Sequence, residues 1–506
     1  MKKSRKFFIL TIYLVAAVTM HSYAQKIYHE EYRPQFHFSP RAGWMNDPNG
    51  MIYFNKQYHL YYQYYPNSDV WGPMHWGHTT SKDLIHWQQQ PIALYPDSLG
   101  YIFSGSIIAD ANNTSGFGKN GTVPLIAIFT HHNMAAEKAG DKNFQTQSIA
   151  YSLDEGFTWI KYDKNPVLKN PGIRDFRDPK VGWFEADKKW IMALATFDRV
   201  TFYSSADLKS WTKESDFGAG IGAHGGAWEC PDLFPLEYDG HKIWVLLVSV
   251  NPGGPNGGSA TQYFTGDFDG KNFISSQTDT RWLDYGTDNY AGVTFSNTGI
   301  QKTFIGWMSN WQYGKAVPTK GWRSAMTIPR NLGIVKMGNK FLVTSLPVKE
   351  LNNIYNSQSI IENIPVTHYD LASKIGKFAG LAEINFTADK IETFSVTLSN
   401  DQGEKMVVGY DKAGDYYYAD RSGSGRVEFE KDFGSFHYAP RLSGKPGLDI
   451  TLIIDNTSLE LFADGGLTVM TEIFFPAKPY TRLYIDSNTG LLVKKLEYHE
   501  LKSTWP

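Results

Sequence analysis

Paired runs of β-branched and aromatic residues, separated by short polar turns, recur along the first two thirds of the chain. Such pairs indicate β-hairpins, and long amphipathic helices are not evident between them. The hairpins begin, some clearly and some more weakly, at Asp47, Ser104, Asp178, Cys230 and Tyr290. Five hairpins in series predict an all-β chain that starts with a five-bladed β-propeller over residues 25–345.

A second repeat runs in step with the hairpins. A Ser-x-Asp motif followed by an aromatic residue occurs, with looser spelling in the last copy, at 81–87, 152–159, 205–211 and 265–273. The mean spacing of roughly 60 residues exceeds that of common propeller repeats but suits blades that carry loops. The two repeats together support the propeller.

The repeat stops after Arg330, and a polar stretch at 351–357 follows. A second series of short alternating runs then begins, including 393–398, 449–454 and 459–462. Alternation of this kind is typical of antiparallel strands with one buried face. It predicts a C-terminal β-sandwich over residues 355–506, which we expect to support the propeller.

The N-terminus has the pattern of a secretory signal. Basic residues occupy most of the first six positions, an apolar run spans 7–20, and Ser22-Tyr-Ala24 follows. The run is shorter than the ~20 residues of a membrane-spanning helix. We therefore expect residues 1–24 to be a signal peptide, and the mature protein to begin near Gln25, without a membrane span, in the periplasm or outside the cell.

Composition restricts the partners of the protein. The 506 residues carry a formal net charge of −2 and no long run of like charge, which argues against nucleic acid or an anionic membrane as the ligand. Aromatic residues make up 15% of the chain, a content that suits stacking on sugar rings and equally suits ordinary β cores. The expected partner is neutral.

Three acidic residues share one local context. Asp47, Asp178 and Glu229 each stand near the start of a hairpin, with a proline one or two positions later. Because the residue before a proline avoids the helical region, we expect these acids to lie on extended backbone. The first strand of each propeller blade lines the central channel, so the three should converge there. Facing carboxylates are what glycoside hydrolysis requires.

Other reactive side chains give weaker signals. Cys230 is the only cysteine, which excludes disulfides within the chain and cysteine-based metal sites, and no His or Asn can be assigned to activate it as a nucleophile. The pair His131 and His132 lacks metal-ligand spacing and is interpreted as solvated loop residues. We expect no metal and no cofactor.

The motifs together resemble the signature set of glycoside hydrolase family 32, which includes invertases, inulinases and levanases. They are Trp44-Met-Asn-Asp-Pro-Asn-Gly50, Trp71 to His78, Phe103-Ser-Gly105, Arg177-Asp-Pro179, Glu229-Cys-Pro231, Met326 to Arg330 and Leu459 to Phe462. The likeness extends from about Phe36 to the C-terminus. The family's fold, a five-bladed propeller followed by a β-sandwich, agrees with the hairpin pattern.

The resemblance implies a retaining β-fructosidase that releases fructose from levan, inulin or sucrose-like substrates. Asp47 would be the nucleophile and Glu229 the acid/base, while Asp178 and Arg177 would hold fructose hydroxyls and stabilise the transition state. This chemistry needs Glu229 protonated, by burial or nearby negative charge, and Asp47 ionised, with Asn46 as one hydrogen-bond donor.

The family pattern also implies a set of sugar-binding residues: Gln63, Trp71, Phe103, Ser104 and Trp311. The loops at 131–147 and 250–262 should shape the channel mouth and so decide linkage preference and mode of attack. At Asp288-Asn-Tyr290 the chain departs from the family, which commonly has an aromatic residue in the middle position. This departure affects the subsite beyond the terminal fructose.

Several alternatives share these features. We expect exo-action on fructan, with an endo-levanase as the nearest alternative, and a fructosyltransferase would use the same residues. An inverting arabinan or xylan hydrolase also gathers acids on a propeller axis, but the Asn46-Asp-Pro-Asn-Gly50 start argues against it. A non-catalytic sugar-binding propeller is disfavoured because all three acids are present.

Overall fold

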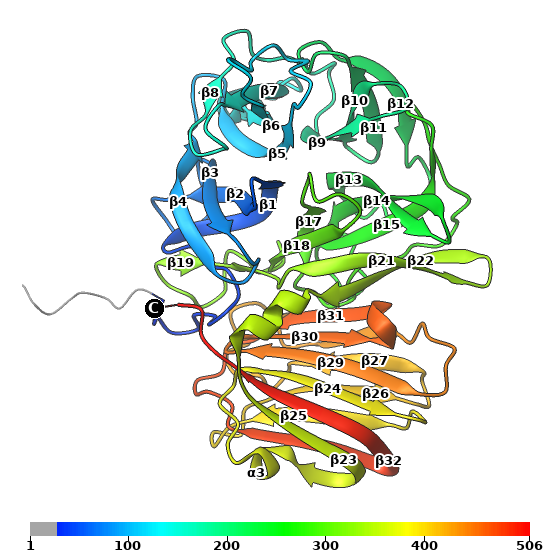
Figure 1. Ribbon diagram of the computed structural model, residues 1–506. Coiled ribbons are helices and arrows are strands. Elements are labelled where there is room, and N and C mark those ends of the chain that lie inside the picture. Colours follow the sequence, from blue (N-terminus) through cyan, green and yellow to red (C-terminus); the bar gives the residue numbers. More distant parts are fainter. Residues whose placement is uncertain (1–27, 506) are drawn as a thin grey trace, which may run out of the picture.

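The structure, a computed structural model, describes residues 28–505 and is built mainly from β-strands (Figure 1). Blade 1 contains β1 (Gly43–Phe54), β2 (Gln57–Tyr65), β3 (His75–Ser81) and β4 (Trp87–Leu94). Blade 2 contains β5 (Tyr101–Ala109), β6 (Leu125–His132), β7 (Gln145–Ser152) and β8 (Ile160–Lys161). Blade 3 contains β9 (Phe176–Phe184), β10 (Lys189–Thr196), β11 (Val200–Ser205) and β12 (Thr212–Phe217).

Two further blades complete the propeller. Blade 4 contains β13 (Ala227–Tyr238), β14 (His241–Asn251), β15 (Ala260–Phe268) and β16 (Phe273–Ile274). Blade 5 contains β17 (Tyr290–Thr294), β18 (Lys302–Met308), β21 (Arg330–Met337) and β22 (Lys340–Pro347), with the short β20 (Ala325–Met326) paired to β18. The prediction of five blades is confirmed.

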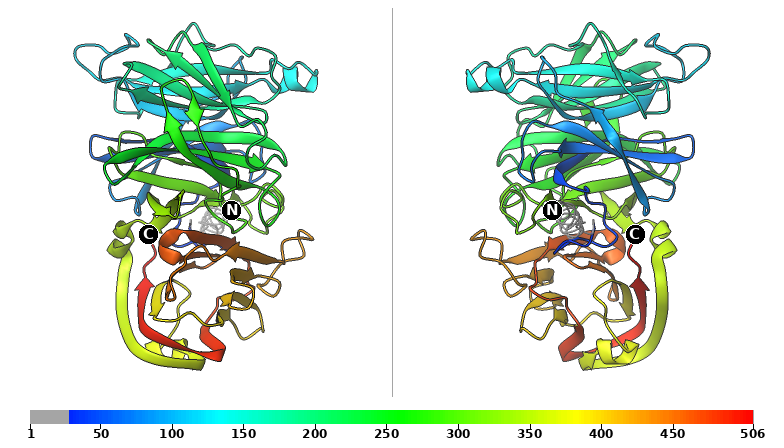
Figure 2. Two further views of the ribbon diagram at one scale, coloured as in Figure 1. Left: turned by 90° about the vertical axis from the view of Figure 1, so that its right-hand side faces the viewer. Right: turned by 90° about the vertical axis from the view of Figure 1, so that its left-hand side faces the viewer.

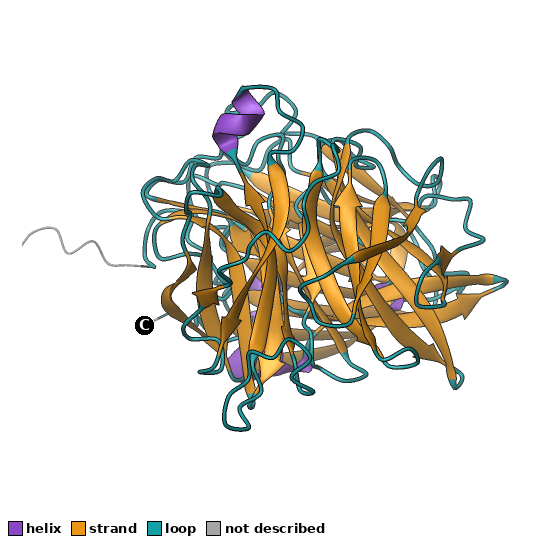
Figure 3. Ribbon diagram, turned by 90° about the horizontal axis from the view of Figure 1, so that it is seen from above, coloured by secondary structure: helices purple, strands orange, loops and turns teal. Residues whose placement is uncertain are grey.

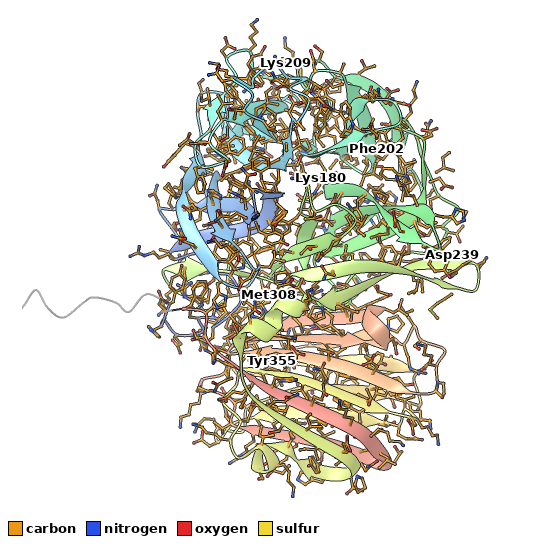
Figure 4. The ribbon with its side chains drawn as sticks, viewed as in Figure 1. Lys180, Phe202, Lys209, Asp239, Met308 and Tyr355 are labelled. Carbon is orange, nitrogen blue, oxygen red and sulfur yellow. The ribbon has the colours of Figure 1, made fainter. Side chains whose placement is uncertain are left out.

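The first strands of the blades form the wall of the central channel. They contact one another in the closed order β1, β5, β9, β13, β17 and back to β1. The short β19 (Trp322–Arg323) pairs with β1 in parallel and so joins the end of the propeller to its beginning. Lys180 on β9 lies at the centre of the ring (Figure 4), and Figure 3 shows the propeller from above.

Every first strand carries a pairing irregularity in its initial part. In β1 it lies between Met45 and Pro48, in β13 between Glu229 and Asp232, and β5, β9 and β17 have equivalent ones. Such bulges re-aim side chains. Asp178 adopts a φ of 62°, in the left-handed region, so the extended backbone predicted before each proline is wrong at this residue. The bulge overrides the local preference.

The Ser-x-Asp repeat forms the turn between the third and fourth strands of a blade. In blade 1, Ser81 Oγ donates to Asp83 Oδ1 at 3.1 Å, and the same carboxylate oxygen accepts the backbone N–H of His86 at 2.9 Å. Ser205 and Asp207 make the equivalent contacts in blade 3. The repeat is conserved within the chain because these side chains close the turn.

The C-terminal part is a β-sandwich with its own hydrophobic core (Figure 2). Its strands are β23 (Tyr355–Asp370), β24 (Ala382–Ala388), β25 (Phe394–Ser399), β26 (Lys405–Asp411), β27 (Tyr416–Asp420), β28 (Phe436–Pro440), β29 (Leu448–Asp455), β30 (Ser458–Ala463), β31 (Thr468–Ile473) and β32 (Arg482–Leu501). The helical segments of the described chain are α2 (Met134–Lys138), α3 (Leu371–Ile375), η1 (Lys349–Ile354) and η2 (Asp464–Gly466). A propeller followed by a sandwich confirms the predicted fold class.

Buried ion pairs connect the two parts. Arg330 of the propeller donates to Glu460 on β30 at 3.1 Å and to Asp284, in the segment before β17, at 2.8 Å. Arg421 of the sandwich donates to Asp288, in the same segment, at 2.8 Å. All five side chains are almost completely buried. Removing one partner from such a network leaves an unpaired buried charge, so the docking is specific.

The predicted signal peptide, residues 1–24, lies outside the described residues. Within residues 28–505, no helix is long and apolar enough to cross a membrane.

His37 provides a test of the interface. Its ring bonds to Asp455 and to Glu460, each at 2.8 Å. Burial would lower the pKa of His37, but hydrogen bonds and charges from the two carboxylates outweigh it and raise the pKa to about 9. Because the pKa of His37 is higher in the folded protein than in the unfolded chain, where it is near 6.5, the charged imidazole stabilises the fold. This contribution is fully present below pH 6.5 and is lost as the pH rises through about 9.

We expect His37→Gln to lower the free energy of unfolding by about 3 kcal/mol at pH 6. The difference from the wild type should shrink at pH 9.5, where the wild-type imidazole has also lost its charge. Urea unfolding of both proteins at the two pH values measures this. An equal difference at both would contradict the ion-pair assignment.

Candidate active site

One cavity at the channel end gathers every site residue predicted from the sequence. It has a volume of about 260 Å³, and all ten predicted residues line it: Asn46, Asp47, Gln63, Trp71, Phe103, Ser104, Arg177, Asp178, Glu229 and Trp311. The lining also includes residues that the sequence did not indicate: His132, Met134, Glu137, Phe144, Gln145, Asp175 and Lys315.

Asp47 lies on β1 and is surrounded by hydrogen-bond donors. Asn46 Nδ2 donates to its Oδ1 at 2.9 Å, and Ser104 Oγ donates to its Oδ2 at 3.2 Å. Trp44 Nε1 in turn donates to Asn46 Oδ1 at 2.7 Å, which fixes the amide so that its NH₂ faces the carboxylate. These contacts orient the carboxylate and favour its ionised form.

Asp178 is held by the backbone of the neighbouring blade. The N–H of Cys230 donates to Asp178 Oδ2 at 3.0 Å, and the N–H of Asp178 donates to Thr130 Oγ1 at 3.0 Å. The Cys230 thiol lies 3.6 Å from Asp178 Oδ2 and 3.7 Å from Asp47 Oδ2. The thiol therefore lies within reach of both carboxylates and can donate its one weak hydrogen bond to either of them.

Glu229, on β13, is bound by a cation and a phenol. Arg177 donates to its Oε1 through Nε at 3.1 Å and through Nη2 at 2.9 Å. The Tyr290 hydroxyl donates to Oε2. Arg177 also pairs with Asp175, whereas its Nε is 3.9 Å from Asp178. Sequence reasoning had placed Arg177 with Asp178, and it missed Tyr290 as a partner of Glu229.

The carboxylates perturb one another because water is largely excluded. Burial and the charge of Glu229 raise the pKa of Asp47 to about 6, against the opposing effect of its donors. Burial also raises the pKa of Asp178, to about 7, with Arg177 opposing the shift and the charges of Glu229 and Asp47 adding to it. Burial and the same carboxylates raise the pKa of the Cys230 thiol well above its ordinary value. Cys230 therefore stays protonated and is a poor nucleophile.

Aromatic rings form the walls of the cavity. Trp311 stacks on Trp44 with ring centroids 6.0 Å apart, and Trp71 meets Phe103 edge to face at 6.3 Å. Gln63 on β2 is buried, and within the described chain its Nε2 has no hydrogen-bond partner. Apolar faces with a few unfilled polar positions are typical of a site for a small polar ligand such as a sugar.

His132 corrects one interpretation of the sequence. It was interpreted, with His131, as a solvated loop residue, yet both side chains are buried at the end of β6. The His132 ring stacks on Phe103 with centroids 4.2 Å apart and bonds to Glu137 at 3.1 Å. The apolar run that precedes the pair could have indicated a strand continuing through it.

The loop at 131–147 reaches the cavity as predicted, whereas no residue of the loop at 250–262 lines it. It contains the helix α2, which projects from the propeller (cyan in Figure 2) and brings Met134 and Glu137 to the cavity wall. On the opposite wall, the Lys315 ammonium lies 5.8 Å from the ring centre of Trp71 and 5.7 Å from that of Trp311. No sequence motif marked Lys315, because its position depends on the fold of the 309–321 loop.

The arrangement suits acid/base and nucleophilic chemistry on a sugar. The three predicted carboxylates and Arg177 line a small cavity with aromatic walls, and Tyr290 bonds to one of these carboxylates, Glu229. Within residues 28–505, no group of three His, Cys, Asp or Glu side chains is arranged to bind a metal ion. Carboxylates facing one cavity are the groups that glycoside hydrolysis requires.

Comparison with known proteins agrees with this geometry. Residues 37–345 match the N-terminal domain model of glycosyl hydrolases family 32, and residues 350–502 match the C-terminal model of the same family. The exo-inulinase structure from Aspergillus awamori superimposes with a TM-score of 0.86 at 34% identity, covering 94% of this chain and all of that one. A β-fructofuranosidase from Schwanniomyces occidentalis gives 0.85 at 32%, covering 95% and 99%.

Curated relatives include the levanase of Bacillus subtilis, 43% identical over 98% of this chain and 74% of its own length. The extracellular exo-inulinase of Aspergillus ficuum is 39% identical, with 94% and 96% covered. Both family models and these relatives span nearly the whole described chain. The chain therefore belongs to glycosyl hydrolase family 32.

Proposed function

We propose that the protein is an exported, exo-acting β-fructosidase that releases terminal fructose from levan or inulin with retention of configuration. The observation that carries the proposal is the meeting of Asp47, Asp178 and Glu229 in one aromatic-walled cavity. The names of the relatives supply the substrate class, since they are levanase and exo-inulinases.

The first step uses Asp47 and Glu229 together. A carboxylate oxygen of Asp47 forms a bond to the anomeric carbon of fructose while the glycosidic bond breaks. Glu229 gives its proton to the departing oxygen.

The second step reverses these roles. Glu229 takes a proton from a water molecule as the water oxygen attacks the anomeric carbon, and the bond to Asp47 breaks. Two inversions at the same carbon give net retention. Tyr290 and Arg177 hold Glu229 in place for both steps, since they bond to different oxygens of its carboxylate.

Asp178 stabilises the positive charge that develops on the sugar. It lies beside Asp47 and is fixed by the Cys230 N–H, so it needs no reorganisation as the charge appears. Its carboxylate is also a strong acceptor for fructose hydroxyls. The unpartnered Gln63 Nε2 and the rings of Trp71 and Trp311 complete a site of about one sugar unit.

Size and location support exo-action outside the cytoplasm. A cavity of about 260 Å³ is at the small end of ligand sites and suits a chain end better than the middle of a polymer. Residues 1–24 carry the pattern of a signal peptide, and the exo-inulinase relatives are named extracellular.

Removing either reacting carboxylate tests the mechanism. We expect Asp47→Ala and Glu229→Ala each to lower kcat on inulin by at least about 1,000-fold, because each removes a group that reacts directly. Circular dichroism should remain that of the wild type. Asp187→Ala, in the turn between β9 and β10, is the control and should keep full activity. Near-full activity of Asp47→Ala would refute the scheme.

The pH profile tests the ionisation of Asp47. The nucleophile must be ionised and its pKa is raised to about 6, so kcat/KM should fall as pH decreases through about 6. Ser104→Ala removes a donor that stabilises the carboxylate. We expect it to move this acid limb to higher pH and to lower kcat/KM about 10-fold at pH 6. If the acid limb of the kcat/KM profile stays where it is in the wild type, the ionising group is not Asp47.

Product analysis tests the mode of attack. Levan, inulin and sucrose are incubated separately and the products resolved by chain length. We expect fructose as the sole early product from both fructans, because only a chain end enters the cavity. A spread of oligomers from levan would instead identify an endo-levanase, and longer oligosaccharides at high sucrose would identify a transferase. An inverted anomer in the first product would refute Asp47 as nucleophile.

A further inference from the structure

Four aromatic side chains share the outer face of the sandwich at β27 and β28, the edge of the sheet. Tyr418 pairs with Tyr438 across the two strands, Tyr416 with Pro440, and Asp420 with Phe436. Directly paired residues point to the same face of a sheet. We call Tyr416, Tyr418, Phe436 and Tyr438 the aromatic patch.

The patch is unusual because it leaves large rings in solvent. Phe436 is 50% exposed and Tyr438 48%, while the alternate residues Tyr417, His437 and Ala439 are buried in the sandwich. The rings support one another, with Tyr416 edge-on to Tyr438 at 5.1 Å and Phe436 nearly parallel to Tyr438 at 6.4 Å. A grouped set of exposed rings marks a binding surface more often than single exposed apolar residues do.

Two contacts connect this edge of the sandwich to loops of the propeller, one of them next to the cavity. Asn256, in the loop after β14, bonds to both the N–H and the C=O of Tyr438, at 3.0 and 2.9 Å. Gln312, next to the cavity residue Trp311, bonds to Asp432 in the loop before β28 at 3.2 Å. The orange edge of the sandwich projects on the same side of the molecule as the cyan α2 (Figure 2).

We propose that the aromatic patch binds the body of a fructan chain whose terminal unit occupies the active-site cavity. The inference rests on the proposed function, because continuity with the cavity identifies the occupant. Ring faces fit the C–H faces of sugar units. The carboxylates of Asp420, at the end of β27, and of Asp411, at the end of the neighbouring β26, are acceptors for hydroxyl groups. The occupant is a neutral, polyhydroxylated polymer.

The geometry separates long substrates from short ones. On this proposal a substrate as short as sucrose is bound by the cavity alone, whereas a long chain contacts both surfaces. A second contact on the same chain raises the effective concentration of its end at the cavity and lowers KM without changing the chemistry. The sandwich then takes part in substrate capture, beyond supporting the propeller.

The test is the double variant Phe436→Ala/Tyr438→Ala. Both side chains are half exposed, so the fold should be unaffected. We expect KM for long-chain levan or inulin to rise about 5- to 10-fold, with kcat unchanged and sucrose kinetics unchanged. Phe157→Ala, which removes a 41% exposed ring in the loop between β7 and β8, is the matched control and should behave as the wild type.

Binding without turnover provides an independent readout. In the Asp47→Ala background, migration through gels containing levan or inulin should be slowed, and the double variant should be slowed much less. If neither migration nor polymer KM changes, the proposal is overturned. It is also overturned if sucrose and polymer kinetics change equally, or if light scattering shows a wild-type dimer that the double variant loses, since the patch would then contact a second copy.

Failure of the proposed function gives a different result. A wild-type protein that hydrolyses neither levan, inulin nor sucrose would refute the function, and the gel assay would still test the patch. Hydrolysis of all three with no dependence on the patch would refute only this inference.

Discussion

A buried ionic network between the propeller and the sandwich fixes the segment on which the active site depends. Arg330 and Arg421 hold Asp284 and Asp288, which flank the short stretch that leads into β17. Tyr290 is the first residue of β17, and its hydroxyl bonds to Glu229. Because the charges are desolvated, only one arrangement satisfies them, so the sandwich sets the position of a residue that bonds to Glu229.

At the channel end, the burial of charged groups changes the pKa values of carboxylates and does not stabilise the docking of the two parts. Asp47 and Asp178 have raised pKa values, chiefly through burial and then through neighbouring charge. The bulges that aim these acids place Asp178 in a left-handed conformation that costs energy for a residue with a side chain. Strain and like-charge repulsion at one place require a rigid scaffold, and the closed ring of inner strands provides it.

Several predictions succeeded because the signal was local. Each hairpin is encoded by its own alternation and turn, and the Ser-x-Asp repeat is encoded by the hydrogen bonds of a single turn. The cavity was predictable because Asp47, Asp178 and Glu229 occupy equivalent positions in different blades. His132 was misinterpreted, since its burial comes from stacking on Phe103 of another strand, and no local pattern reports that contact.

The sequence by itself determined the all-β repeat, the sandwich and which carboxylates meet in the cavity, because periodicity and motif spacing are properties of short segments. Only the tertiary structure decided which groups tune those carboxylates. Arg177 bonds to Glu229 across 52 positions, Tyr290 reaches it across 61, and Arg330 joins Glu460 across 130. Such pairs form only when the ring has closed and the sandwich has docked, because these two steps exclude water from the paired groups. A short segment cannot exclude water by itself.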